Sequence, residues 1–223
     1  ARINTRGDGK SLLLFNPLSW SRTGIVELPL TELEDSFEIH DENGELIASQ
    51  LIEDKKAVFV AENLPSVGYK EYRIRSSRRE KQIATNLSCE ETEKEIRLEN
   101  EFIVTIIDKK TGLLTSVVEK SGKKEILRDQ GNLFQIFEDH PVKGRKCVNY
   151  PVDAEVFDAW EIYIYQQPGG VKCVELKDPV EVKLLEKGPV RARVSVKYKY
   201  LQQGRPDTVF ASEITLYHKM PLL

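Results

Sequence analysis

The amino-acid sequence predicts an all-β protein. Short runs of alternating apolar and polar residues recur along the chain, and turn-forming residues separate them at intervals of about 8 to 12 residues. No stretch longer than about ten residues shows a clean helical repeat, so we expect little helix. A length of 223 residues is sufficient for one large domain or two smaller ones.

The N-terminal part predicts a small β-sandwich of the immunoglobulin-like type. The dipeptide Asn43-Gly44 stands between two strand-like runs and is a strong hairpin signal. The polar segment 76–82 has the composition of a linker, so the predicted domains are residues 1–78 and 79–223. Trp20 either plugs this sandwich or serves as a ligand platform, and we expect the first role. The expected strands are residues 12–15, 24–28, 37–40, 45–51, 57–61 and 68–75.

The C-terminal part predicts a second set of strands. Segment 90–99 is interpreted as a turn followed by a strand, and residues 108–112 are expected to form a turn. In segment 191–200, apolar and charged residues alternate almost perfectly, which places five residues from Ala192 to Tyr200 on one face. We expect the charged face to be solvated or to pair with an acidic domain outside this sequence. The expected strands are residues 96–100, 102–107, 113–119, 133–137, 160–165, 180–185, 192–200 and 209–217.

Composition and charge exclude several classes of protein. A formal net charge of −3 gives no basic surface for nucleic acid, and no apolar run of about 18 residues predicts a membrane span. The three cysteines are an odd number without a Cys-x-x-Cys spacing, which favours a reduced, cytoplasmic setting. The three histidines lie far apart in sequence, so neither a metal site nor a cofactor is expected here.

The long predicted loop 138–160 holds the candidate site residues. A connection of roughly twenty residues is longer than compact domains normally use. Carboxylates can accept paired hydrogen bonds from vicinal sugar hydroxyls, and an indole face can pack on a pyranose. The loop therefore predicts a surface that faces substrate or a domain interface; the alternative is that its aromatic residues are core anchors and its acids a solvated rim. The candidates are Asp139, Asp158 and Trp160, with His140 and Tyr163 behind them.

Two segments resemble a known enzyme family, and a third resembles a known fold. The string FNPLSW-x-R-x-G-x-V-x-L-P at residues 15–29, and GN…FEDHP…DAWEIY at residues 131–163, resemble the C-terminal β-region of the family 38 glycoside hydrolases, the α-mannosidases. Segment 98–120 resembles the first hairpins of a galactose-mutarotase-like β-supersandwich. A mutarotase uses a histidine and an acid that cannot be matched here, so that activity is not expected.

The resemblance implies a role within a larger enzyme. Family 38 enzymes are retaining α-mannosidases whose zinc ion and nucleophilic aspartate belong to an N-terminal catalytic domain, and this sequence matches none of those motifs. We therefore expect a non-catalytic fragment with no catalytic residue and no metal of its own. The missing catalytic domain of the same polypeptide, with its zinc, is the expected partner. A mannose-containing glycan is the expected substrate of the full enzyme, to whose outer subsites the loop 138–160 contributes.

Two other functions stay open. A free-standing carbohydrate-binding, lectin-like sandwich would present a shallow aromatic platform. An adhesion module of the immunoglobulin type would suit the strands, although a Cys…Trp…Cys pattern is lacking. If a supersandwich is cut at Leu223, one sheet loses strands, which predicts a homodimer through the exposed edge.

Overall fold

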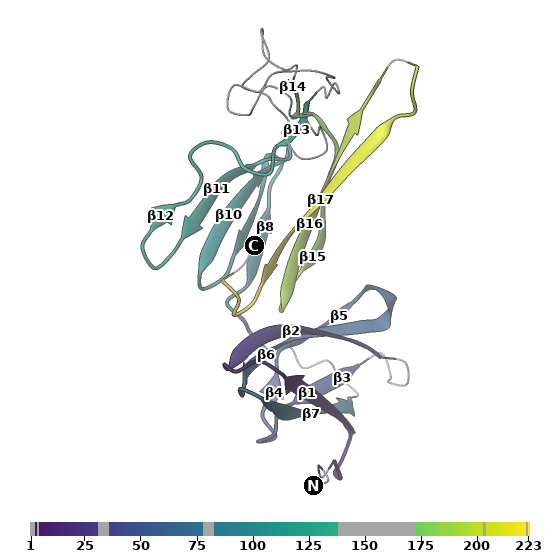
Figure 1. Ribbon diagram of the computed structural model, residues 1–223, viewed down its shortest axis with the longest axis vertical. Helices are drawn as coiled ribbons and strands as arrows, with labels where there is room; N and C mark the ends of the chain where they lie inside the picture. The colour runs from purple at the N-terminus through teal and green to yellow at the C-terminus, as the bar shows by residue number, and fades with distance from the viewer. Residues whose placement is uncertain are drawn as a thin grey trace, which may run out of the picture. The chain divides into compact units, whose positions relative to one another are not determined.

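The computed structural model describes residues 3, 5–30, 36–77, 83–137, 173–202, 204–221 and 223 (Figure 1). The described residues form antiparallel strands and one short 3-10 turn, η1 (Glu53–Lys55), without an α-helix, which confirms the all-β fold class. No helix in these ranges is long and apolar enough to cross a membrane. The chain divides into two compact units, one of Ala1–Gly131 with Asp178–Leu223 and one of Asn132–Lys177.

Two sheets of the first unit form the predicted small sandwich. Their inner faces share one apolar core, in which the rings of Phe59 and Tyr72 lie 5.0 Å apart. Residues 57–61 are buried on both faces of their strand, because Val58 and Val60 pack with Val190 in a second apolar cluster. This double burial explains the unbroken apolar run AVFVA. One sheet has the order β1 (Lys10–Asn16), β7 (Gly68–Ser76), β3 (Phe37–His40), β4 (Leu46–Ile47); the other has the order β2 (Arg22–Pro29), β6 (Lys56–Leu64), β5 (Ser49–Ile52).

The predicted hairpin at Asn43-Gly44 is confirmed, and the strand after it is corrected. Gly44 N donates to Asp41 O at 3.0 Å, with Gly44 in the left-handed region at a φ of +81°. The expected strand 45–51 is two strands, because the chain leaves one sheet after β4 and enters the other as β5. The segment 45–51 thus contributes a strand to each of the two sheets of the sandwich.

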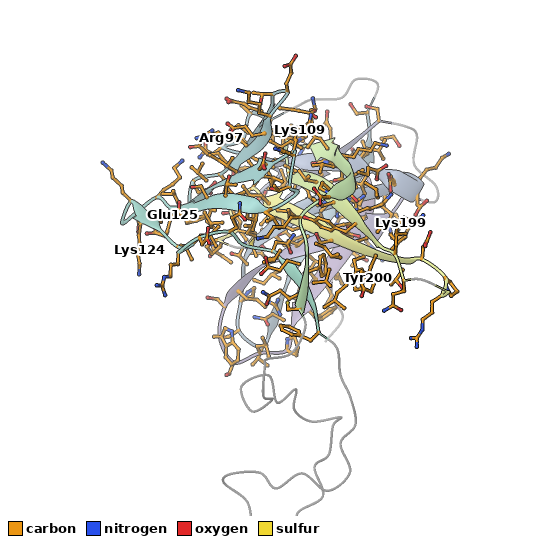
Figure 2. All side chains as sticks on the ribbon, turned by 90° about the horizontal axis from the view of Figure 1, so that it is seen from above. Arg97, Lys109, Lys124, Glu125, Lys199 and Tyr200 are labelled. Carbon is orange, nitrogen blue, oxygen red and sulfur yellow. The ribbon has the colours of Figure 1, made fainter. Side chains whose placement is uncertain are left out.

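Two further sheets of the first unit contain most of the other predicted strands. The turn at Gly112 lies against the central strand β16 (Arg191–Tyr200), whose Tyr198 Oη donates to Thr111 O at 2.8 Å. Lys199 and Tyr200 lie at the end of this strand, where Lys199 Nζ pairs with Asp207 Oδ2 at 2.5 Å (Figure 2). One sheet has the order β12 (Lys124–Glu125), β11 (Leu114–Glu119), β10 (Ile103–Asp108), β9 (Glu95–Glu99), β8 (Ser88–Glu91); the other has the order β15 (Pro179–Lys187), β16, β17 (Thr208–Tyr217).

The charged face of β16 is not the solvated surface that alternation predicts. Arg191 and Ser195 on this face are buried, at 5% exposure each. The Arg191 guanidinium pairs with Glu186 of β15 and with Glu27 of β2, both at 2.6 Å. The prediction of a solvated face, or of one awaiting an acidic partner domain, was therefore wrong at Arg191, whose acids come from the same chain. The other face is buried as expected at Ala192, Val194, Val196 and Tyr198, while Tyr200 is half-buried.

The second unit contains one described strand pair. β13 (Phe134–Phe137) pairs antiparallel with β14 (Cys173–Leu176), and Gln135 Nε2 donates to Glu175 Oε1 at 2.9 Å. β13 matches an expected strand. The expected strand 160–165 lies outside the described residues, as does most of the linker 76–82, so the boundary between residues 78 and 79 stays a prediction.

Candidate functional site

The five residues predicted from the long loop cannot be placed in a site. Asp139, His140, Asp158, Trp160 and Tyr163 all lie in segment 138–172, outside the described residues. Their roles toward a sugar or a domain interface stay predictions. The described residues instead offer two other features, a polar cavity and an exposed aromatic surface.

The polar cavity lies in the first unit and has a volume of about 440 Å³. It is lined by five segments that are distant in sequence: the β3–β4 hairpin, β6, β7, residues 83–86 and the turn after β17. Acidic, basic and amide side chains all face it. The lining residues are Asp41, Glu45, Leu46, Ile47, Ala48, Val60, Glu62, Asn63, Lys70, Tyr72, Ile83, Ala84, Thr85, Asn86, His218 and Lys219.

Several charged groups that line the cavity form hydrogen bonds or ion pairs within the chain, which stabilise the fold. Asp41 Oδ1 accepts from the backbone N–H groups of Asn43 at 2.9 Å and Glu45 at 2.8 Å, which fixes the hairpin turn. Glu62 pairs with Lys219. Burial, followed by the charges of Asp41, Glu42 and Glu62, raises the pKa of Tyr72 to about 12. Its phenol therefore stays protonated at neutral pH, when it cannot act as a base.

A histidine and a carboxylate meet at the edge of the cavity. His218 Nδ1 lies 3.9 Å from Glu101 Oε2, and both atoms are buried without a hydrogen-bond partner. Burial lowers the pKa of His218, and the nearby Glu101 opposes that shift. The imidazole is therefore neutral at pH 7 and gains a proton only in acid. Glu101 and His218 are 117 positions apart in the sequence, so sequence analysis does not reveal this pair.

The described residues do not fit a metal ion. They contain no group of three or more histidine, cysteine, aspartate or glutamate side chains that could hold one. Both ring nitrogens of His40 are already engaged, Nδ1 with Gly44 O at 3.1 Å and Nε2 with Glu38 Oε2 at 3.0 Å. The zinc that the family resemblance implies therefore finds no ligand set in this part of the chain.

The second feature is an exposed aromatic surface on the small sandwich. We call it the Trp20 surface, and its members are Phe15, Trp20, Val67 and Tyr69. Phe15 and Tyr69 are opposite each other on β1 and β7, with ring centroids 5.7 Å apart. Trp20 is 60% exposed, so the expectation that it plugs the sandwich was wrong.

A buried asparagine explains why Trp20 stays outside. The Asn16 side chain is 2% exposed and joins the 16–20 loop to the turn that carries Val67. Its Nδ2 donates to Trp20 O at 2.8 Å, Pro65 O at 3.0 Å and Leu64 O at 3.3 Å, while its Oδ1 accepts from Leu18 N at 3.1 Å. The polar residue of the FNPLSW string therefore fills the inner position, and the indole is directed outward.

Comparison with known proteins gives one family and one fold. No curated protein matches the chain in sequence. A solved alpha-mannosidase from Enterococcus faecalis V583 has the same fold over 94% of this chain, with a TM-score of 0.59 and 15% identity. The match spans 28% of that longer protein. Residues 98–223 match the family model of the "Glycosyl hydrolases family 38 C-terminal domain". Because that match covers more than half of the sequence, the chain belongs to the C-terminal domain family of the family 38 glycosyl hydrolases.

Proposed function

We propose that this chain is the non-catalytic β-region of a retaining α-mannosidase that hydrolyses terminal α-mannose residues. The family match over residues 98–223 carries the proposal. The solved protein of the same fold, described as an alpha-mannosidase, supports it. In this proposal the second set of sheets is the first part of a galactose-mutarotase-like supersandwich, and the region works as a scaffold in a cytoplasmic enzyme.

The electrostatics of the described carboxylates support a scaffold role. The acid of a glycosidase needs a raised pKa so that it can protonate the leaving oxygen. Hydrogen bonds and cations instead lower the pKa of Glu99, mainly through Lys120, and of Glu125, mainly through Ser116. The pKa is also lowered in Glu119, Glu175 and Glu181. These five groups are ionised at neutral pH, so they accept hydrogen bonds and hold no proton for a leaving group.

The chemistry is proposed to lie in the rest of the polypeptide. A retaining glycosidase needs two carboxyl groups roughly 5 to 5.5 Å apart, one as nucleophile and one as acid and base. In this proposal those groups and the zinc belong to an N-terminal catalytic domain, which is the partner of the β-region. The mannose-containing glycan binds there.

The first experiment establishes whether a larger enzyme exists. The intact mass of the source polypeptide is measured, and its hydrolysis of 4-nitrophenyl α-D-mannopyranoside is followed in the presence of Zn²⁺. We expect a polypeptide several times longer than 223 residues that releases 4-nitrophenol. A longer polypeptide without α-mannosidase activity would refute the proposed function.

We further propose that loop 138–160 helps to form the outer subsites of that enzyme. Asp158→Ala and Trp160→Ala in the whole polypeptide are expected to raise KM for an oligomannose substrate while leaving Tm unchanged. Lys199→Ala serves as the matched surface control. Loss of expression or of Tm without a change in KM would show that these residues only pack against other parts of the protein.

The Trp20 surface favours a second candidate, a carbohydrate-binding module. An indole that is 60% exposed is the kind of group on which a pyranose can stack. Titration of the 223-residue chain with mannose and mannobiose, followed by tryptophan fluorescence, tests this function. Saturable binding that Trp20→Ala abolishes would support the module, and an unchanged signal would exclude these sugars as its ligands.

A further inference from the structure

The Trp20 surface combines unusual exposure with a fixed geometry. Phe15 is 64% exposed, Trp20 60%, Val67 74% and Tyr69 44%. Single exposed apolar residues are common in soluble proteins, but a group of four on the adjoining ends of β1 and β7 and on the loops beside them indicates a place of contact. The loops are joined directly by Val67 N, which donates to Leu18 O at 2.9 Å, and by the Asn16 amide.

The turn that presents Val67 is strained. Val67 has a φ of +42°, in the left-handed region that β-branched residues rarely adopt. Such a backbone costs about 1–3 kcal/mol and persists only when its surroundings hold it. Gly68 allows the turn, because a Cβ there would lie 2.8 Å from Pro65 Cγ. The Val67 side chain is 74% exposed, so burial of that side chain does not offset the strain.

The geometry of the rings favours a protein surface over a sugar as the occupant. The Phe15 and Tyr69 planes are tilted by 43°, so they do not form the flat platform on which a pyranose would lie. Glu71 lies two residues from Tyr69 on the same face of β7, where Arg73 Nη2 and Ser11 Oγ bind it at 2.5 Å and 2.9 Å. This carboxylate is therefore already engaged and not free to bind sugar hydroxyls.

We propose that the Trp20 surface docks against the part of the family 38 polypeptide that lies outside this region. In the alpha-mannosidase from Enterococcus faecalis V583, the match covers only 28% of the chain, so most of such a polypeptide is available as the occupant. Contact within one polypeptide also needs little intrinsic affinity, because the effective concentration is high. This inference rests on the proposed function.

Tryptophan accessibility tests the docking. Trp160→Phe leaves Trp20 as the single tryptophan of the 223-residue sequence. In the whole source polypeptide, any other tryptophan is also replaced by phenylalanine. Acrylamide should quench Trp20 strongly in the 223-residue chain and several-fold less in the whole polypeptide. Equal quenching, with the unsubstituted source polypeptide active as an α-mannosidase, would overturn the docking alone. Failure of the proposed function is seen separately, as a source polypeptide without α-mannosidase activity.

A matched pair of variants separates docking from folding. Val67→Asp should leave the 223-residue chain at least as stable as before, because aspartate tolerates the left-handed region better than valine. In the whole polypeptide the same change should raise the quenching of Trp20, whereas Val180→Asp, at a site 61% exposed on β15, should not. No effect of Val67→Asp on quenching would contradict the proposal. Two other outcomes would also contradict the proposal. Protection of Trp20 in the 223-residue chain that increases with protein concentration would show that the occupant is a second copy. Protection that appears when mannose is added would show that the occupant is a sugar.

Discussion

At the scale of single residues, Arg191 ties the two pairs of sheets together. Its guanidinium is bound by Glu186 and Glu27, and hydrogen bonding to Glu186 raises its pKa further. Gln50 of β5 completes the network: its Oε1 accepts from the backbone N–H groups of Val190 and Arg191, and its Nε2 donates to Glu186. The network therefore links β5 and β2 to β15 and β16.

We predict that Arg191→Ala strongly destabilises the chain. The change leaves the Glu186 carboxylate, whose side chain is 9% exposed, without its bidentate partner. Arg193 Nη2 remains 3.2 Å from Glu186, so we expect a loss of about 3 kcal/mol, at the lower end for a broken buried pair. Urea unfolding measures it. Lys199→Ala, which removes an exposed pair on the same strand, should cost less than about 1 kcal/mol. Similar losses for both variants would contradict this role of Arg191.

His218 predicts a specific sensitivity to acid. Burial lowers its pKa in the folded state, so the unfolded chain, with an ordinary pKa of about 6.5, binds the proton more readily. The stability from the neutral imidazole is therefore complete above about pH 6.5 and is lost progressively as the pH falls below that value.

The test compares thermal unfolding of the wild type and His218→Gln. The fall in Tm between about pH 7.5 and about pH 5.5 should be smaller in the variant, because glutamine does not titrate. The stability that ionised carboxylates such as Glu99 contribute to the fold is lost only nearer pH 4.5. These carboxylates therefore affect the Tm of both proteins equally in this window. An identical fall in both proteins would show that His218 does not cause the sensitivity.

At the scale of elements, tight turns fix how the strands meet. Gly112, at a φ of +71°, ends the hairpin between β10 and β11 directly against β16. A Cβ at this position would lie 2.5 Å from both Tyr198 Oη and Val196 Cγ1. Gly44 has a similar φ of +81°, but a Cβ there would meet nothing within 4 Å. The two glycines thus share a left-handed backbone, which would be strained in any other residue, and they differ in packing.

We predict that Gly112→Ala and Gly44→Ala have unequal costs. Gly44→Ala should destabilise the chain by about 1 kcal/mol through backbone strain alone. Gly112→Ala adds the displacement of Tyr198 and Val196, so its cost should reach about 3 kcal/mol. Urea unfolding with an unchanged m value measures both. Equal costs would show that the sheets move apart without resistance at this turn.

The sequence predicts most strands because burial alternates with a period of two. The inner face of β16 is predicted for this reason, while the hairpin at Asn43-Gly44 is predicted from its turn-forming dipeptide. The pattern fails at β4 and β5, where one segment of sequence contributes a strand to each of two sheets. Alternation does not show which neighbouring strand a segment pairs with. It fails again at Arg191, whose partner Glu27 is 164 residues away.

The site is less predictable than the fold. Residue types made Asp158 and Trp160 candidates, but both lie outside the described residues, so this prediction stays open. Trp20 was assigned to the core because large aromatic side chains are usually buried. The signal against that assignment is Asn16, whose amide can satisfy four backbone groups only from an inner position. The pair of Glu101 and His218 had no local signal at all.

At the scale of the whole molecule, the chain is proposed to be a scaffold that depends on the rest of an enzyme. Its own charged networks are occupied in holding sheets together, and its exposed aromatic surface faces outward. The homodimer expected through a sheet edge stays a prediction, which light scattering at increasing protein concentration would test. A constant monomer mass would contradict it.

We propose that this region does not perform the chemistry of its family. The most direct test is the activity of the purified 223-residue chain toward 4-nitrophenyl α-D-mannopyranoside over a titration of Zn²⁺, with the whole source polypeptide as the reference. We predict that the chain, folded as judged by its far-ultraviolet circular dichroism, releases no more 4-nitrophenol than buffer alone at every Zn²⁺ concentration. Zn²⁺-dependent hydrolysis by the chain itself would contradict this proposal.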